Sequence, residues 1–359
     1  MSLNFRQGVP GYQPLYCLRD SLILLRGRTL YRSDLDLRRF EAFCKLPHEK
    51  PIGRIPGRLI ARIFRLGADA AALLDGNEVL VARRSTIYRV SLETGAWTVD
   101  LAVPGGARAL YLSAVSDPAT GRRAICFGEY STRFDGGAIN VWRRGMAPDD
   151  AWQITGTFAA GEIDHVHNVC QVTDGTVYIL TGDFDRAAAI WKTDFALSSF
   201  TPVVRGSQDV RACWLWQSPE GALYFATDSQ FETNHLRRIA GGETEDVAEI
   251  IGSSIYAYGD KERLIFSTAV EPGALSGKRL RDIFDRTPGP GIVSNDAALY
   301  LLADGKFSLI HREAKDRWPM RLAQFGTFKL PGGEMPADRF YAFGVGVKRN
   351  DGCCLYFRQ

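Results

Sequence analysis

Four acidic residues stand at equivalent places in a recurring pattern, and they are the first candidates for chemistry. Each closes an apolar run that begins at a turn, and the four are Glu129, Asp183, Asp228 and Glu271. Two carboxylic acids can cleave a glycosidic bond, one as acid and the other as nucleophile or base. We expect Glu129, paired with Asp183 or Glu271, to be catalytic. An acid in this place can instead cap a turn, although glutamate does so less readily than aspartate.

Two histidines with one residue between them form the second candidate group. On a β-strand, His165 and His167 would place both imidazoles on one face, a spacing that suits a shared metal ion. Asp183 or Gln208 could complete such a site. Without a metal, the same histidines could bind sugar hydroxyls or satisfy buried carbonyl groups. The sequence therefore predicts no particular cofactor and no metal site. The alternative is a metal ion held by His165 and His167.

The remaining candidates are polar residues that we expect to bind substrate. Arg211 could hold a uronate, sialate or phosphate through two parallel hydrogen bonds. A salt bridge from Arg211 to Asp209 or Asp228 is the alternative. The full predicted binding set is Tyr130, His165, His167, Gln208, Arg211, Asp228 and Asn234.

A repeated sequence pattern, called the phrase below, positions these residues along the chain. Its first half is a turn followed by an apolar strand that ends near an acid, and its second half is a strand with an aromatic and a basic residue. The spacing is roughly fifty residues, in the range of propeller repeats. Copies of the first half are residues 121–130 (GRRAICFGEY), 175–183 (GTVYILTGD), 221–228 (GALYFATD) and 261–271 (KERLIFSTAVE). Copies of the second half are residues 30–34 (LYRSD), 87–90 (IYRV), 141–144 (VWRR) and 190–194 (IWKTD).

This pattern predicts an all-β fold, a single β-propeller domain over residues 1–359. Short strands with turn residues between them and almost no helical periodicity favour four-stranded blades, six or seven in number. A polar insertion occupies residues 272–294. We expect the C-terminal strand within residues 340–358 to pair with N-terminal strands within residues 15–46, which closes the ring. Adjacent strands run antiparallel, so the candidate residues should share one funnel mouth.

Two segments resemble a known motif. Residues 31–40 (YRSDLDLRRF) and 191–200 (WKTDFALSSF) are similar to the Asp boxes of sialidases and other BNR-repeat glycosidases, with Asp34 and Asp194 as the acids. In such boxes the aspartate caps a turn and an aromatic packs beneath it. The resemblance implies architecture, and sialidase activity is not carried over because the arginine triad with its Tyr and Glu pair is not found.

A longer stretch resembles a second group. Residues 127–234 are similar to uncharacterised bacterial propellers that are associated with polysaccharide biosynthesis clusters. This resemblance implies a context in exopolysaccharide biosynthesis, with an association at the periphery of the polysaccharide assembly machinery. It implies no particular reaction.

Composition excludes several classes of protein. Lys and Arg total 44 against 41 Asp and Glu, without a concentrated basic segment, so nucleic acid is not an expected partner. No apolar run reaches the roughly 18 residues of a membrane span. Residues 1–13 lack the pattern of a secretory signal, and 7 cysteines, an odd number, suit reduced thiols. We therefore expect a cytoplasmic protein.

These observations predict a carbohydrate-active protein. Its ligand would be a polar or anionic glycan or a nucleotide sugar, and its reaction would be of the glycosidase or glycosyl-transfer type. One alternative is a metal-dependent lyase or isomerase of acidic sugars that uses His165 and His167. Another is a propeller that binds glycans or proteins without catalysis, since a fold does not fix a function.

Overall fold

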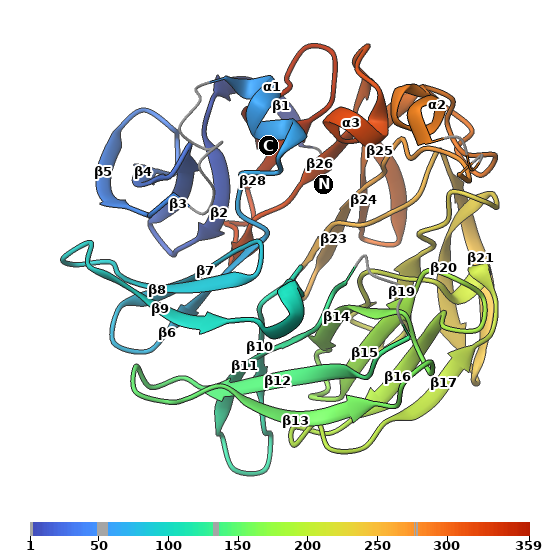
Figure 1. Ribbon diagram of the computed structural model, residues 1–359, viewed down its shortest axis with the longest axis horizontal. Helices are drawn as coiled ribbons and strands as arrows, with labels where there is room; N and C mark the ends of the chain where they lie inside the picture. The colour runs from blue at the N-terminus through green and yellow to red at the C-terminus, as the bar shows by residue number, and fades with distance from the viewer. Residues whose placement is uncertain (1–2, 49–56, 132–135, 276, 278) are drawn as a thin grey trace.

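Seven antiparallel sheets follow one another around a central axis in the computed structural model (Figure 1). The structure describes residues 3–48, 57–131, 136–275, 277 and 279–359. The sheets are the blades of an all-β propeller, as the sequence predicts, and the number of blades is seven. The innermost strand of each blade lines the axis.

The blades have the following strands, from the innermost outward. The first blade has β2 (Gln13–Cys17), β3 (Ser21–Arg26), β4 (Thr29–Asp34) and β5 (Phe40–Lys45), with the short β27 (Gly332–Gly333) parallel to β2. The second has β6 (Ala70–Leu74), β7 (Glu78–Arg83), β8 (Thr86–Ser91) and β9 (Trp97–Ala102). The third has β10 (Ser113–Ser116), β11 (Arg123–Gly128), β12 (Ile139–Gly145) and β13 (Gln153–Phe158). The fourth has β14 (His165–Gln171), β15 (Val177–Gly182), β16 (Ala189–Thr193) and β17 (Thr201–Arg205). The fifth has β18 (Trp216–Gln217), β19 (Leu223–Ala226), β20 (Asn234–Ala240) and β21 (Glu243–Ile250). The sixth has β22 (Ala257–Gly259), β23 (Arg263–Ser267), β24 (Asp296–Ala303) and β25 (Lys306–Ala314). The seventh has β26 (Thr327–Lys329), β28 (Arg339–Val345), β29 (Cys353–Arg358) and β1 (Asn4–Pro10).

The two ends of the chain close the ring. Strand β1 pairs antiparallel with β29, in a register that places Asn4 opposite Arg358. Closure by N- and C-terminal strands is therefore confirmed, but the N-terminal strand concerned is β1, not a strand within residues 15–46. Those later residues build the first blade, which explains why the count is seven.

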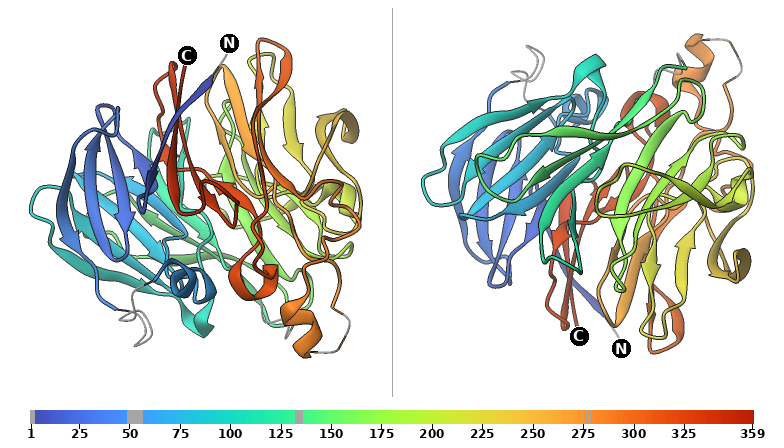
Figure 2. Two further views of the ribbon diagram at one scale, coloured as in Figure 1. Left: turned by 90° about the horizontal axis from the view of Figure 1, so that it is seen from above. Right: turned by 90° about the horizontal axis from the view of Figure 1, so that it is seen from below.

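Short helices lie in loops on one face of the ring (Figure 2). They are the α-helices α1 (Arg58–Ile63), α2 (Arg279–Phe284) and α3 (Met320–Ala323), and the 3-10 helices η2 (Pro104–Gly106) and η3 (Gln208–Val210). Helix α2 belongs to the predicted insertion, which joins β23 to β24. None of the helices in the described part of the chain has the length and apolar character needed to cross a membrane.

Burial follows the place of each strand in its blade. Strand β3 (SLILLR) is buried at its first five positions, whereas the outermost strand β9 is mostly exposed. Inner strands pack against two neighbouring blades, so apolar residues are needed on both of their faces. The outermost strand β9 lies at the rim and exposes even apolar residues, Trp97 and Val99.

The outermost strand of every blade carries a β-bulge. In each blade one residue of the fourth strand is left without an opposite residue on the third. Such a bulge increases the local twist and makes an exposed edge less able to pair with another chain. The extra residues are Arg6, Phe43, Asp100, Thr155, Val203, Val247 and Ile310.

The two Asp-box-like turns have the expected capping geometry. The Asp34 carboxylate accepts the backbone N–H of Arg38 at 2.8 Å, and that of Asp194 accepts the N–H of Leu197 at 3.1 Å. Leu37 and Leu197, each three residues after the acid, both have a φ of 56°. Their buried side chains hold a backbone conformation that glycine usually supplies. These aspartates are therefore structural.

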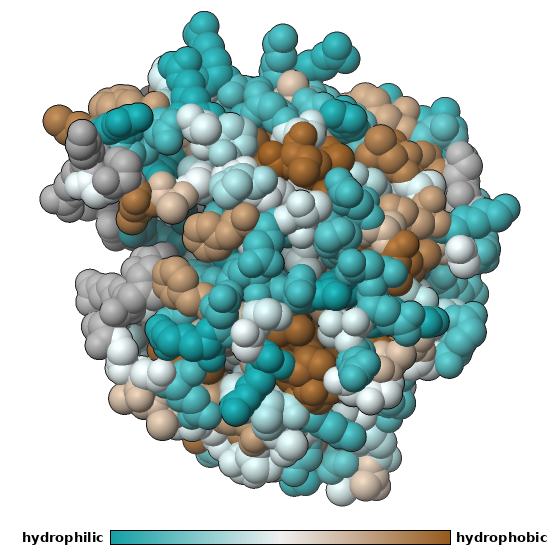
Figure 3. All heavy atoms as spheres, turned by 90° about the vertical axis from the view of Figure 1, so that its right-hand side faces the viewer, coloured by the Kyte–Doolittle hydropathy of each residue, from teal (hydrophilic) through white to brown (hydrophobic). Residues whose placement is uncertain are grey.

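The side of the molecule shown in Figure 3 is largely polar. On the side shown in Figure 3, hydrophobic residues form separate small patches between hydrophilic ones. All seven cysteines are free thiols.

Candidate functional site

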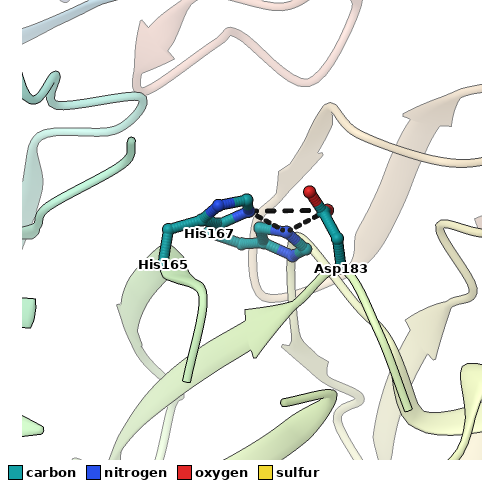
Figure 4. A group of neighbouring side chains, drawn as sticks. All are labelled: His165, His167 and Asp183. Atoms are coloured by element: carbon teal, nitrogen blue, oxygen red, sulfur yellow. Dashed lines mark hydrogen bonds and ion pairs between the residues drawn. The ribbon is translucent and has the colours of Figure 1, made fainter. Parts of the chain in front are cut away.

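Two histidine side chains from the innermost strand of the fourth blade contact each other (Figure 4). The Nε2 atoms of His165 and His167 are 3.0 Å apart, and their ring centroids are 4.9 Å apart. His167 is the extra residue of a β-bulge, because Val166 pairs with Thr181 while Asn168 pairs with Leu180. Bulges often re-aim a side chain beside a functional site. Here the bulge and the two-residue spacing together place both rings at the axis.

Backbone carbonyl groups fix the orientation of both rings. His165 Nδ1 lies 3.0 Å from the carbonyl oxygen of Ser131, and His167 Nδ1 lies 2.8 Å from that of Ala212. A carbonyl can only accept, so Nδ1 is the protonated nitrogen in each ring. Burial lowers the pKa of His167, which favours the neutral ring. The neutral His167 ring then presents Nε2 as an acceptor.

Asp183 brings a carboxylate to the same point. It directly follows β15, and its Oδ1 lies 3.4 Å from the Nε2 atoms of both His165 and His167 (Figure 4). Burial alone would raise the pKa of Asp183, but the two histidines and Arg211 outweigh it and hold that pKa well below its usual value. The Asp183 side chain is 21% exposed, so solvent reaches the group.

Three acceptor atoms thus converge at separations of 3.0, 3.4 and 3.4 Å. Ligand atoms that share one metal ion at about 2.1 Å stand roughly 3 to 3.4 Å apart, so this triangle has the size of a metal centre. Two imidazoles with one carboxylate suit iron(II), manganese or zinc and leave positions for substrate.

A second group in the described residues shares one of these ligands. His167, Cys213 and Asp228 also bring one ligand atom each to within 4.8 Å of the others. Burial and the neighbouring Asp228 raise the pKa of the Cys213 thiol well above its usual value, and its Sγ lies 3.2 Å from Asp228 Oδ2. We take the first group as the better candidate, because its three separations are known to be 3.4 Å or less and its Asp183 is partly exposed.

Arg211 holds the acids of the site in place. Its Nη2 lies 2.8 Å from Asp183 Oδ1 and 3.3 Å from Asp228 Oδ2. Its Nη1 donates to the Asp183 carbonyl oxygen at 3.2 Å and to Gln230 at 3.0 Å. The predicted alternative of a salt bridge to Asp228 is therefore present. With both terminal nitrogens engaged, Arg211 orients Asp183.

Two further acids surround this arginine. Burial is the main reason that the pKa of Asp228 is raised to about 8 and that the pKa of Glu271 is also raised. The Arg211 charge opposes both shifts. Asp228 Oδ1 and Glu271 Oε2 are buried without a hydrogen-bond partner among the described residues. Both carboxyl groups therefore favour the protonated state more than an exposed acid does.

Two predicted binding residues support the backbone of the site. Gln208 donates to the Asp183 carbonyl oxygen at 3.1 Å and to Asp185 Oδ1 at 2.9 Å. Asn234 donates to the carbonyl oxygens of Ser229 and Gly291 at 2.7 and 3.0 Å. Gln208 thus touches the acidic group, whereas Asn234 ties the loop after β19 to the insertion.

Glu129 and Tyr130 are neighbours in sequence but point to different surroundings. The Glu129 carboxylate accepts the indole N–H of Trp142 at 2.8 Å and the amide groups of Asn140 at 3.2 Å. The Tyr130 ring lies 4.3 Å, centroid to centroid, from that of His165. The structure therefore brings Tyr130 to the histidines, while Glu129 is turned toward its own blade.

Glycine at position 182 allows the close packing of the site. A Cβ at Gly182 would lie 2.4 Å from His167 Cε1 and 3.2 Å from Arg211 Cγ. Any side chain here would push the imidazole or the guanidinium away. The strand that delivers Asp183 must therefore end in glycine.

Several charged residues near the axis were not predicted from sequence. Lys329 lies on β26, Arg108 and Asp69 precede inner strands of their blades, and Cys213 lies beside Asp228. The rule that residues at the start of an inner strand reach the axis would have found Asp69. Lys329 and Cys213 carry no comparable signal, because their repeats are degenerate.

Comparisons with known proteins identify the fold. No protein family and no curated protein matches the chain. Among solved structures, an extracellular domain from B. thetaiotaomicron matches at 12% identity and a TM-score of 0.56, over 99% of this chain and 42% of that one. A chain of the mitotic checkpoint complex matches at 12% identity and a TM-score of 0.54, over 99% and 92%. Puromycin hydrolase matches at 12% identity and a TM-score of 0.52, over 92% of this chain and 52% of that one.

These likenesses define the class of protein. At such low identity they show a seven-bladed β-propeller and no more, and membership of the sialidase family is not shown. The likenesses leave the reaction to be argued from the residues of the site itself.

Proposed function

We propose that this protein is a metal-dependent enzyme that acts on an acidic carbohydrate by elimination or isomerisation. The metal would be a divalent transition-metal ion held by His165, His167 and Asp183. The observation that carries this proposal is the convergence of two Nε2 atoms and a carboxylate oxygen within 3.4 Å of one another. Both rings are oriented from behind by carbonyl groups, as in many metal sites.

The surroundings of the three ligands support a catalytic role. Three protein ligands leave coordination positions open for substrate, which is typical of catalytic centres. Arg211 contacts Asp183 in the manner of the outer-shell partners that tune metal ligands. The partial exposure of Asp183 supports access by a small ligand.

The substrate class follows from charge. An ion held by His165, His167 and Asp183 would supply Lewis-acid polarisation of a substrate carboxylate, which would make a hydrogen on the adjacent carbon easier to remove. In elimination, the C5–H and C4–O bonds of a uronate break and a C4=C5 double bond forms. The proton goes to a base and the leaving oxygen takes a proton from an acid. Asp228, with its pKa of about 8, is suited to donate that proton. The resemblance to propellers of polysaccharide biosynthesis clusters supports a carbohydrate substrate.

Metal binding is the first test. Protein incubated with Mn²⁺, Fe²⁺ or Zn²⁺ and then dialysed should retain one ion per chain, measured by elemental mass spectrometry. His165→Ala should lower the affinity more than about 100-fold, since it removes a ligand. His235→Ala, on β20, is the matched control and should bind normally. An unmodified protein that retains no metal, or equal binding by all three proteins, would contradict the proposal.

Glycoside cleavage by carboxyl groups alone is the second candidate. One observation favours it: around Arg211 the pKa of Asp183 is lowered while that of Asp228 is raised. Such a split is typical of an acid and its partner carboxylate. Hydrolysis of a glycan that persists in a chelator but is lost in Asp183→Asn would support this candidate. An ultraviolet signal of an unsaturated uronate that vanishes in chelator would support the metal-dependent one.

A further inference from the structure

A second group of charged side chains lies near the axis, contributed by blades across the ring from the histidines. Strands β26 and β6 belong to the seventh and second blades, whereas β14 belongs to the fourth (Figure 1). Lys329, at the end of β26, donates from Nζ to the Ala68 carbonyl oxygen at 3.3 Å and lies 5.8 Å from the centre of the Tyr256 ring. Burial lowers the pKa of Lys329; Asp69 opposes this, while Arg108 and Arg65 add to it.

The charges of this group do not balance. Arg108 binds Asp69 through two nitrogens, with Nε 3.1 Å from Asp69 Oδ2, so the acid whose charge acts on Lys329 is already paired. Among the residues that the structure describes, neither Lys329 nor Arg65 forms an ion pair. Lys329 and Arg65, beside the paired Arg108, therefore give this group more positive than negative charge. A small oxyanion would balance that charge.

Tyr130 connects this group to the histidines. Its ring lies 4.3 Å from that of His165, its backbone N–H donates to the backbone carbonyl of Arg108 at 2.9 Å, and its carbonyl accepts the backbone N–H of Arg108 at 2.9 Å. Burial is the main reason that the pKa of Tyr130 is raised; the Asp183 charge adds to this shift and the Arg65 charge opposes it. Tyr130 thus joins the two groups, with its ring beside His165 and its backbone paired with that of Arg108.

We propose that Lys329 and Arg65, supported by Arg108, bind the anionic group of a ligand whose other oxygen atoms face His165 and His167. This inference rests on the proposed function and narrows its substrate to a carbohydrate that bears a carboxylate or phosphate. It also reassigns the anion-binding role that the sequence suggested for Arg211, whose terminal nitrogens already bind acids and carbonyl groups.

Calorimetric titration with three probes tests this subsite. With Mn²⁺ present, glucuronate or glucose 6-phosphate should bind more tightly than glucose, and the stronger of the two identifies the group as carboxylate or phosphate. Lys329→Gln should weaken that probe about tenfold and leave glucose unchanged, since a charge-assisted hydrogen bond is lost. Arg65→Gln, at an exposed position, should act in the same direction with little risk to folding.

Controls separate this inference from the metal proposal. Lys306→Gln changes an exposed lysine at the start of β25 and should bind all three probes normally. If Lys329→Gln, Arg65→Gln and the unmodified protein all prefer the acidic probe over glucose to the same degree, the proposed anion subsite is overturned, even if the protein binds metal. If the protein binds no metal, the same titrations without Mn²⁺ still decide the subsite, and only the metal proposal fails. No preference for either acidic probe over glucose also overturns the subsite.

Discussion

At the scale of single residues, the site depends on how each polar atom is held. His165 and His167 are anchored through Nδ1, and Asp183 is anchored by Arg211. Groups held in this way do not need to reorganise when a cation binds, so little of the binding free energy is lost to ordering. The arrangement costs stability, because several ionisable groups are buried around Arg211.

The pH dependence of stability should reveal that burial. Because the pKa of Asp228 is raised to about 8, the folded protein binds more protons than the unfolded chain between the ordinary aspartate pKa and pH 8. Stability from this group is therefore full at low pH and is lost as the pH rises. We expect unfolding to become easier by up to about 1.4 kcal/mol per pH unit in that window.

Substitution separates this effect from the rest of the molecule. Asp228→Asn resembles the protonated side chain, so its melting temperature should fall less between pH 5.5 and 8 than that of the unmodified protein. Arg211, Glu271, Asp183 and Cys213 all act on this carboxyl group, so the remaining slope reports them. Asp149→Asn, at an exposed position, should keep the original slope. Equal slopes for all three proteins would show that Asp228 is not the cause.

Much of the site could be predicted from residue positions. The antiparallel rule brought His165, His167, Asp183, Arg211 and Asp228 together because strand ends of one kind meet at one face. It says nothing about the direction of a side chain, and so Glu129 was grouped with them although Trp142 and Asn140 bind it. Lys329 was missed because the last repeat lacks the phrase.

At the scale of elements, small backbone irregularities do the positioning. The bulge at His167 and the glycine at the end of β15 let an imidazole and a guanidinium pack beside one strand end. Neither feature could be predicted, because a bulge is decided by the pairing of two strands and not by either sequence alone. The Asp-box turns were predictable because Asp34 and Asp194 cap them locally.

Gly182→Ala tests this positioning. The new methyl group would lie 2.4 Å from His167 Cε1, so the ring must move while the surrounding blade can stay folded. We expect metal affinity to fall at least tenfold with a smaller loss in melting temperature. Gly273→Ala is the matched control, because a Cβ there meets nothing closer than 3.5 Å. Unchanged metal affinity in Gly182→Ala would contradict this account of the site.

At the scale of the whole molecule, ring closure depends on one short strand. Strand β1 is largely exposed and carries little apolar pattern, which is why the sequence left the blade count at six or seven. The number of blades follows from the pairing of β1 with β29. The sequence near either strand does not predict this pairing, because the two strands lie far apart in the chain.

Removal of β1 should therefore open the ring. A chain that begins at Gly11 would leave the outer edge of β29 unpaired, and such an edge invites pairing with another molecule. We expect a lower melting temperature and self-association, measured by light scattering after gel filtration. Arg6→Ala, which loses one hydrogen bond to the Gln359 carbonyl oxygen, should remain like the unmodified protein. A truncated chain that stays monomeric and equally stable would show that closure contributes little.

The same closure has a consequence for biosynthesis. Because Asn4 pairs with Arg358, β1 leaves the ribosome long before β29 and must wait for it before it finds its partner. Blades two to six can form in order as the chain emerges, but β1 stays unpaired until β29 has been made. A nascent chain of this protein thus carries an unprotected segment during that time, and slow completion of the seventh blade would prolong the period in which neighbouring nascent chains can exchange strands.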